Sequence, residues 1–190
     1  MDSTIKTEKS GAKIKTLDMT YIAMFAVVIA ICSWISIPAQ IPFTLQTFGV
    51  FLTVGVLGGK RGTLSVLIYL LLGMVGVPVL AGFVGGISFY VGNTGGYLVG
   101  FFFSALAMWA MERILGKRKW VLALSMVIGL AVCYAFGTIW FIIFYSQNTG
   151  AIGVWTALSW CVFPYIIPDI IKIALALLIC KKLAKVIKID

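Results

Sequence analysis

The stretch that decides the fold reads Phe163-Pro164-Tyr165-Ile166-Ile167-Pro168-Asp169-Ile170-Ile171-Lys172. It places an acid and a base three positions apart inside an apolar run. Residues at i and i+3 share one face of a helix, so Asp169 and Lys172 are expected to point the same way. If Pro168 is the first helical residue, Asp169 lies in the first turn, where the helix dipole favours an anion. The alternative is a helix that begins earlier and is kinked at Pro168.

The composition around this pair is that of a membrane protein. The chain has 190 residues, of which 62% are hydrophobic and 11% charged, and its mean hydropathy is +1.09. Soluble domains are nearer half apolar and about a quarter charged. A charge near the middle of a bilayer costs at least about 2.5 kcal/mol, so an ionisable pair left there is expected to serve a function. The composition predicts an all-α integral membrane protein.

Several site classes lack their sequence signals. The chain has no histidine, the commonest general base and metal ligand. Its four cysteines stand singly, without the C-x-x-C spacing of zinc or redox motifs. The turn Gly58-Gly59-Lys60-Arg61-Gly62 does not match the phosphate-binding pattern G-x-x-x-x-G-K-[ST]. No metal site, no cofactor and no enzyme activity are therefore predicted.

The positive charges predict the topology. Apolar runs indicate six membrane helices, over about 17–37, 45–58, 62–77, 93–114, 120–145 and from near 168 to 183. All Lys and Arg residues except Lys172 lie in the polar tail 1–16, in or beside the turns after the second and fourth helices, or at and beyond the end of the last helix. The positive-inside rule then places both termini in the cytoplasm. The net charge of +9 thus reflects topology rather than nucleic-acid binding, and residues 17–190 are expected to form one membrane domain.

Alanines mark one face of the first helix. Ala23, Ala26 and Ala30 fall in this span, and Ala26-x-x-x-Ala30 has the spacing of a small-residue stripe. Small residues let helices approach closely in lipid. The stripe indicates either a docking face for another protein or a contact within the bundle. Gly92, Gly96 and Gly100 make a second stripe at the start of the fourth helix.

The chain resembles the BioY family, the biotin-specific substrate-binding (S) components of energy-coupling factor (ECF) transporters. The resemblance covers nearly the whole chain. It departs at Asn93, where a proline is expected, and at 81–83, where more glycine is expected. The residues that carry it are 41–47 (Ile-Pro-Phe-Thr-Leu-Gln-Thr), 69–73, 76–79, Gly85-Gly86, 94–98 (Thr-Gly-Gly-Tyr-Leu), Gly100-Phe101 and Pro168-Asp169-Ile170-Ile171-Lys172.

The resemblance implies a six-helix subunit of the cell membrane with the S-component fold, which binds biotin from outside with high affinity. It also implies partners, namely a transmembrane coupling protein and two ATP-binding-cassette ATPases. The alanine stripe of the first helix is similar to the motif with which S components dock the coupling protein. Biotin is the transported ligand in this family and not a cofactor.

Biotin has an apolar ring system, a ureido group and a carboxylate, so its pocket needs apolar walls and a few polar groups. Asp169 can accept from the ureido N–H groups, and Lys172 can pair with the carboxylate or steady Asp169; both roles stay open. The other candidates come from the glycine-rich segment 78–94 and its neighbours. They are Phe83, Phe89 and Tyr90 as ring walls, Asn93 as donor and acceptor, Gly85 and Gly86 in the loop, and Gln46, Ser88 and Tyr97.

Three other classes compete with this prediction. A stand-alone secondary transporter for a vitamin-like substrate would use Asp169 as its ion-coupling carboxylate. A membrane enzyme would need chemistry that a chain without histidine, H-E-x-x-H or an acid pair does not offer. In a purely structural subunit, Asp169 and Lys172 would be an ion pair that only fixes helix packing.

Overall fold

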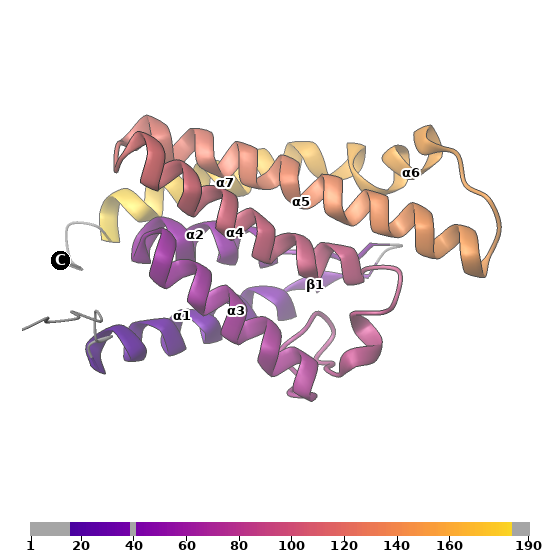
Figure 1. Cartoon of the computed structure of the whole chain (residues 1–190), viewed down its shortest axis with the longest axis horizontal. Helices are drawn as coiled ribbons and strands as arrows, with labels where there is room; N and C mark the ends of the chain where they lie inside the picture. The colour runs from indigo at the N-terminus through magenta and orange to yellow at the C-terminus, as the bar shows by residue number, and fades with distance from the viewer. Residues whose placement is uncertain (1–15, 39–40, 184–190) are drawn as a thin grey trace, which may run out of the picture.

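The computed structural model describes residues 16–38 and 41–183, and most of these residues are helical (Figure 1). This confirms the predicted all-α class. The elements are α1 (Thr16–Trp34), β1 (Ser36–Ile37), β2 (Phe43–Thr44), α2 (Gln46–Leu57), α3 (Gly59–Val75), the 3-10 turn η1 (Ile87–Phe89), α4 (Gly95–Leu115), α5 (Lys119–Asn148), α6 (Val154–Cys161) and α7 (Phe163–Leu183).

Four helical segments of the described chain are long and apolar enough to cross a membrane. They are α1, α4, α5 and the segment Val154–Leu183, in which α6 and α7 follow each other almost directly. Helix α2 is apolar but has only 12 residues. Large apolar side chains such as Ile31, Ile139 and Leu178 are about half exposed. Such a surface suits lipid, which is as apolar as these side chains.

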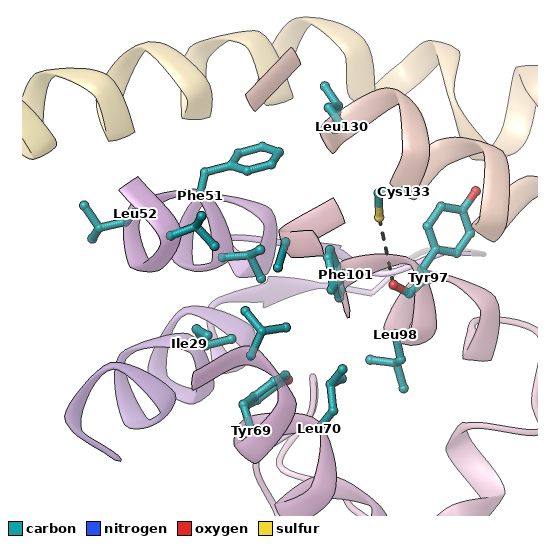
Figure 2. Close-up of a cluster of buried hydrophobic side chains, with 14 of the residues drawn as sticks. Ile29, Phe51, Leu52, Tyr69, Leu70, Tyr97, Leu98, Phe101, Leu130 and Cys133 are labelled. Carbon is teal, nitrogen blue, oxygen red and sulfur yellow. Dashed lines mark hydrogen bonds between the residues drawn. The ribbon is translucent and has the colours of Figure 1, made fainter. Parts of the chain in front are cut away.

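Helix α2 lies at the centre of the bundle. It contacts α1, α3, α4, α5 and α7, and most of its residues are buried. Its buried side chains Phe51 and Leu52 belong to the same hydrophobic cluster as Ile29 of α1 and Tyr69 and Leu70 of α3 (Figure 2). The first residues of α2, at the end near the hairpin β1–β2, are therefore surrounded by several helices.

Glycines bring α4 and α5 into close contact, the most extensive between any two helices of the bundle. A Cβ atom at Gly96 would lie 2.1 Å from the Cβ of Trp140, and one at Gly137 would lie 2.2 Å from the ring of Tyr97. Neither distance is compatible with a side chain. The predicted close-packing stripe is thus confirmed at Gly96 and Gly100, whereas Gly92 precedes the helix.

Two predicted boundaries are wrong. Phe43 and Thr44, expected at the end of a loop, form the strand β2, in which Thr44 pairs with Ser36. The segment 146–160, expected to be a loop, contains most of α6. Helix α7 begins at Phe163, in agreement with the alternative of an earlier start, so Pro168 lies inside it and Asp169 is not in the first turn. Pro164 stands in that turn, where a missing N–H costs nothing because the first amides have no partner within the helix.

The two ends of the bundle differ in charge. The α2–α3 turn with Lys60 and Arg61, the α4–α5 turn 116–118 and the end of α7 lie together, on the left of Figure 1. The hairpin β1–β2, the loop between α3 and α4, and the segment before α6 lie at the opposite end. Residues 76–94 and 149–153 at that end carry no charged side chain.

Candidate functional site

A pocket opens at the uncharged end of the bundle. Its volume is about 210 Å³, and most of its surface is apolar. Helices α2, α4, α5 and α7 supply its inner wall, and the loop between α3 and α4 supplies its outer wall. The lining residues are Ile41, Pro42, Thr44, Gln46, Thr47, Leu80, Ala81, Val84, Phe89, Thr94, Tyr97, Leu98, Phe101, Cys133, Tyr134, Cys161, Tyr165, Asp169 and Lys172.

Asp169 and Lys172 form an ion pair in this wall. Nζ of Lys172 lies 2.8 Å from Oδ1 of Asp169, and the two residues are 5% and 2% exposed. The prediction that they share one face of a helix is confirmed. Because both charges are almost completely removed from solvent, each needs the other and further hydrogen bonds to offset the loss of hydration.

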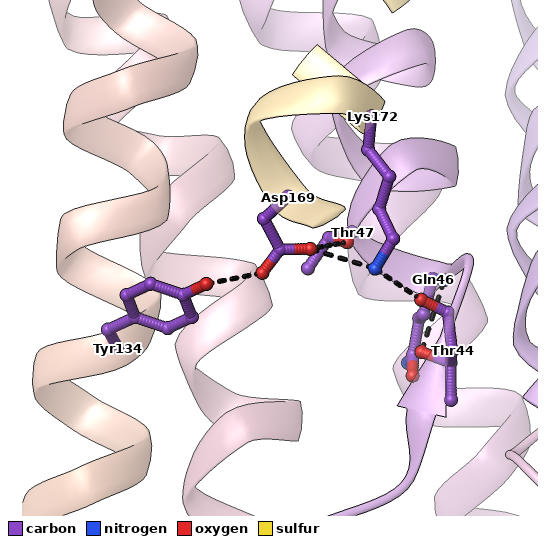
Figure 3. A network of polar contacts seen from close by, with 6 residues as sticks. All are labelled: Thr44, Gln46, Thr47, Tyr134, Asp169 and Lys172. Carbon is purple, nitrogen blue, oxygen red and sulfur yellow. Dashed lines mark hydrogen bonds and ion pairs between the residues drawn. The ribbon is translucent and has the colours of Figure 1, made fainter. Parts of the chain in front are cut away.

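The carboxylate of Asp169 joins three helices. Thr47 of α2 donates to Oδ1 over 3.0 Å, and Tyr134 of α5 donates to Oδ2 over 2.5 Å (Figure 3). With Lys172, three donors therefore reach one carboxylate. These hydrogen bonds, rather than the helix dipole that the sequence suggested, satisfy the buried carboxylate.

Lys172 already has several partners within its own chain. Besides Asp169, its Nζ donates to the backbone carbonyl of Thr44 over 2.6 Å. It also lies 4.2 Å from the centre of the Phe43 ring, a cation–π distance. An ammonium group has three N–H bonds, and the chain offers a partner for each of them.

Two other polar residues of the wall also connect helices. Nε2 of Gln46 donates to the hydroxyl of Tyr69 over 2.8 Å. The hydroxyl of Tyr97 lies 3.3 Å from Oγ1 of Thr138 and donates to the carbonyl of Cys161. Gln46 and Tyr97, both candidates from the sequence, thus line the pocket and also stabilise the bundle. Within residues 16–38 and 41–183, no group of three His, Cys, Asp or Glu side chains is placed to hold a metal ion.

The loop between α3 and α4 sends only part of its predicted residues to the pocket. Phe89 lines it, whereas Phe83 is 64% exposed and stacks on Trp34 at 4.9 Å between ring centres. Tyr90 is buried away from the pocket, donates to the carbonyl of Leu70, and has its pKa raised by burial to about 12. The remaining candidates also lie outside the lining: they are Gly85, Gly86, Ser88 and Asn93.

Hydrogen bonds fasten this loop to the bundle at two points. Nε1 of Trp34 donates to the carbonyl of Pro78 over 2.9 Å, and Nε1 of Trp140 donates to the carbonyl of Gly92 over 3.0 Å. Phe83 adopts a φ of 59°, which is strained for a residue with a bulky side chain. The loop is therefore a separate wall that indole groups of α1 and α5 hold in place.

Sequence reasoning missed several residues of the site. Thr47 was visible as a polar group at the start of an apolar helix, which lipid would not tolerate unpaired. Tyr134 stands in the apolar run of α5 without a local signal. The contacts of Thr44 and Phe43 with Lys172 depend on the hairpin, whose two-residue strands carry no recognisable alternation.

The alanines of α1 lie on two different faces. Ala26 and Ala30 are each 3% exposed and pack inside the bundle. Ala23 is exposed. For Ala26 and Ala30, burial favours the alternative of a contact within the chain, and Ala23 is the alanine that another protein can reach.

Comparisons with known proteins agree on one family. The model of the BioY family matches residues 6–189. The biotin transporter BioY of Thermotoga maritima is 42% identical over 85% of this chain and 92% of its own length. The probable biotin transporter BioY of Pyrococcus horikoshii is 37% identical over 90% of this chain and 98% of its own.

A solved structure is similar as well. It is described as the S-component for biotin from an ECF-type ABC transporter, determined at 2.1 Å. It is 28% identical, and the match covers 89% of this chain and 91% of that chain with a TM-score of 0.79. The bundle described above is thus similar in fold to an ECF S-component.

Proposed function

The chain belongs to the BioY family, and on this premise we propose that it is the biotin-binding membrane subunit of an ECF-type uptake transporter. The single observation that carries the proposal is the buried carboxylate of Asp169 in the wall of a mostly apolar pocket. Biotin requires this combination, because its rings need apolar walls and its ureido N–H groups need an acceptor.

Counting donors supports a direct role for Asp169. A carboxylate offers about four lone-pair sites, and three donors of the chain reach it: Thr47, Tyr134 and Lys172. One site is left for an N–H of the ligand. The geometry of the three donors fixes the plane of the carboxylate before the ligand arrives, which lowers the entropic cost of binding.

Lys172 is assigned the positioning role. Asp169, the Thr44 carbonyl and the Phe43 ring already surround its ammonium group. A bond to the carboxylate of biotin would require it to give up one of these partners. Lys172 therefore steadies Asp169 and neutralises its charge, and the ligand carboxylate lies nearer the mouth of the pocket.

The apolar walls and the loop complete the site. Phe89, Val84 and Leu80 of the loop face Leu98 and Phe101 of α4 across the pocket. In this proposal Phe83, Asn93 and the neighbouring Gly85, Gly86 and Ser88 come nearer the ligand when this loop closes over bound biotin, whereas Tyr90 supports the loop from the bundle through its hydrogen bond to the Leu70 carbonyl. The loop then acts as a lid whose anchors are Trp34 and Trp140.

Biotin enters from the outer side in this proposal. The basic turns lie at one end of the bundle and the pocket at the other, so the positive-inside rule directs the pocket outward. Six membrane spans follow if α6 and α7 count as one and α2 and α3 as two shorter spans, with both termini in the cytoplasm. Residues 17–190 then form one domain; the tail 1–16 lies almost wholly outside the described residues.

A coupling protein and two ATP-binding-cassette ATPases would supply the energy for transport. The docking face on α1 would use the exposed positions Ala23, Val27 and Ile31, which recur every fourth residue. Ala26 and Ala30, which are buried, would contribute indirectly by letting α1 pack closely against the rest of the bundle.

Binding and energy supply are tested separately. Calorimetric titration of the purified protein with biotin tests the pocket, and desthiobiotin and lipoate serve as competing ligands. A protein that binds none of them would overturn the proposal. Uptake by cells with and without the ATPases tests the transporter class, because uptake that follows the proton gradient alone would identify a secondary transporter.

A further inference from the structure

A second cavity lies at the charged end of the bundle, away from the biotin pocket. Its volume is about 270 Å³, and it lies between the end of α2, the end of α4 and the first turns of α5. Val54, Met108 and Val121 form its floor and are each no more than 3% exposed. The floor is thus a buried apolar surface, and none of its three residues lines the biotin pocket.

The mouth of the same cavity is cationic. Lys117, Arg118 and Lys119 line it and are exposed. Among the residues that the structure describes, Glu112 is the only acidic one in the lining, and it already has partners: it accepts a hydrogen bond from the amide of Gly59 and lies 3.5 Å from Nζ of Lys117. The mouth therefore keeps an excess of positive charge over an apolar interior.

The start of α5 adds to this potential. Arg118 occupies the N-cap position and makes no capping hydrogen bond with its side chain. The first amides of a helix have no partner within it and carry the positive end of its dipole, which favours an anion such as a phosphate. Arg118 and Lys119, at the start of α5, both line this cavity together with Lys117.

We propose that this cavity binds an anionic phospholipid, with the phosphate at the basic mouth and the upper part of one acyl chain on the apolar floor. Basic pockets between membrane helices on the cytoplasmic side are suited to such headgroups. A free phosphate would use the mouth and leave the apolar floor unused, whereas a phospholipid satisfies both. The proposal is independent of biotin binding, because the two cavities share no lining residue.

Lipid retention measures this site directly. The protein in nanodiscs or mild detergent is offered phosphatidylglycerol and phosphatidylcholine with matched chains, and bound lipid is counted by native mass spectrometry. Phosphatidylglycerol should be retained in preference. The triple variant Lys117→Gln, Arg118→Gln, Lys119→Gln should lower its retention at least about tenfold. The variant Lys181→Gln, Lys182→Gln removes charge from the end of α7 and should retain the lipid.

A variant in which the cavity is filled distinguishes lipid bound inside the cavity from lipid that the basic surface merely attracts. Leu122 lines the cavity and is half-buried, so Leu122→Trp should occupy the floor and release the lipid while every charge stays. Unchanged retention in Leu122→Trp would mean attraction to the basic surface alone and would overturn the proposal.

Two further outcomes would also overturn it. Displacement of the lipid by inorganic phosphate would assign the mouth to a free anion. Equal retention of both lipids by the isolated protein, with crosslinks from Lys117 to the coupling protein, would assign the cavity to a protein partner. Calorimetric titration with biotin is the folding control for every variant and should be unchanged.

Discussion

Tyr134 of α5 donates its hydroxyl proton to Asp169 of α7, with Oη 2.5 Å from Oδ2, across 35 positions of sequence. The bond ties two helices of the pocket together at the residue proposed to meet the ligand. Thr47 adds the same connection from α2. Removing any one of these partners therefore changes both the site and the packing, and the variants below are chosen to separate the two effects.

Asp169→Asn should weaken biotin binding about 10- to 100-fold, because a hydrogen bond from a ureido N–H to a charged acceptor is replaced by one to a neutral amide. Calorimetric titration in detergent measures the change. Asp18→Asn is the matched control, since Asp18 pairs with Arg61 at 3.0 Å on another part of the bundle. Equal affinities in wild type and a folded Asp169→Asn protein would refute the role of Asp169.

The charges of Asp169 and Lys172 should be coupled in stability. Either Asp169→Asn or Lys172→Gln leaves the other charge buried without its partner, at a cost of about 3–5 kcal/mol. The double variant removes both charges, so it should lose less stability than the sum of the single variants. Denaturation of the three proteins in detergent gives the coupling energy. Additive losses would show that the two groups act independently.

Tyr134→Phe should lower biotin affinity about 3- to 10-fold while the protein stays folded, because it removes one donor to Asp169 and keeps the ring. Tyr145→Phe is the control on the same helix; Tyr145 stacks on Phe141 and does not contact Asp169. A loss of affinity in both variants alike would point to a general effect on α5 rather than to the carboxylate.

Trp34→Phe should speed the dissociation of biotin by about 2- to 10-fold and leave association nearly unchanged. The substitution removes the hydrogen bond to the Pro78 carbonyl, worth about 0.5–1.5 kcal/mol, and so loosens the loop that closes the pocket. Stopped-flow fluorescence gives both rates. Hydrogen exchange should quicken across residues 78–92, and protection identical to wild type would argue against a lid.

The face of α1 that docks a partner can be found with bulky substitutions. Ala23→Trp should abolish co-purification of the coupling protein at unchanged thermal stability, because Ala23 is exposed. Ala26→Leu should instead cost about 1–3 kcal/mol of stability through overpacking, since Ala26 is 3% exposed. Ile139→Trp on the exposed side of α5 is the control. Retained co-purification in Ala23→Trp would exclude this face.

The helical membrane class and the importance of Asp169 and Lys172 could be read from the chain, because both depend on local properties. Long apolar runs predict spans whatever their neighbours are, and a spacing of three residues puts two side chains on one face of any helix. The start of α7 at Phe163 and the helix α6 within 146–160 were harder to predict from the sequence. The signals there, Pro168 and a run of mixed polarity, suit either a helix or a loop.

By itself, then, the sequence determined that this is a helical membrane protein of the BioY family with an ion pair in its last helix. Only the tertiary structure decided which groups surround that pair, since Thr47, Tyr134 and the Thr44 carbonyl lie up to 128 positions away from Lys172 or Asp169. The tertiary structure also decided that Ala26 and Ala30 are buried inside the bundle. The physical reason is that a buried charge must find its partners wherever packing places them, and packing is set by all helices together.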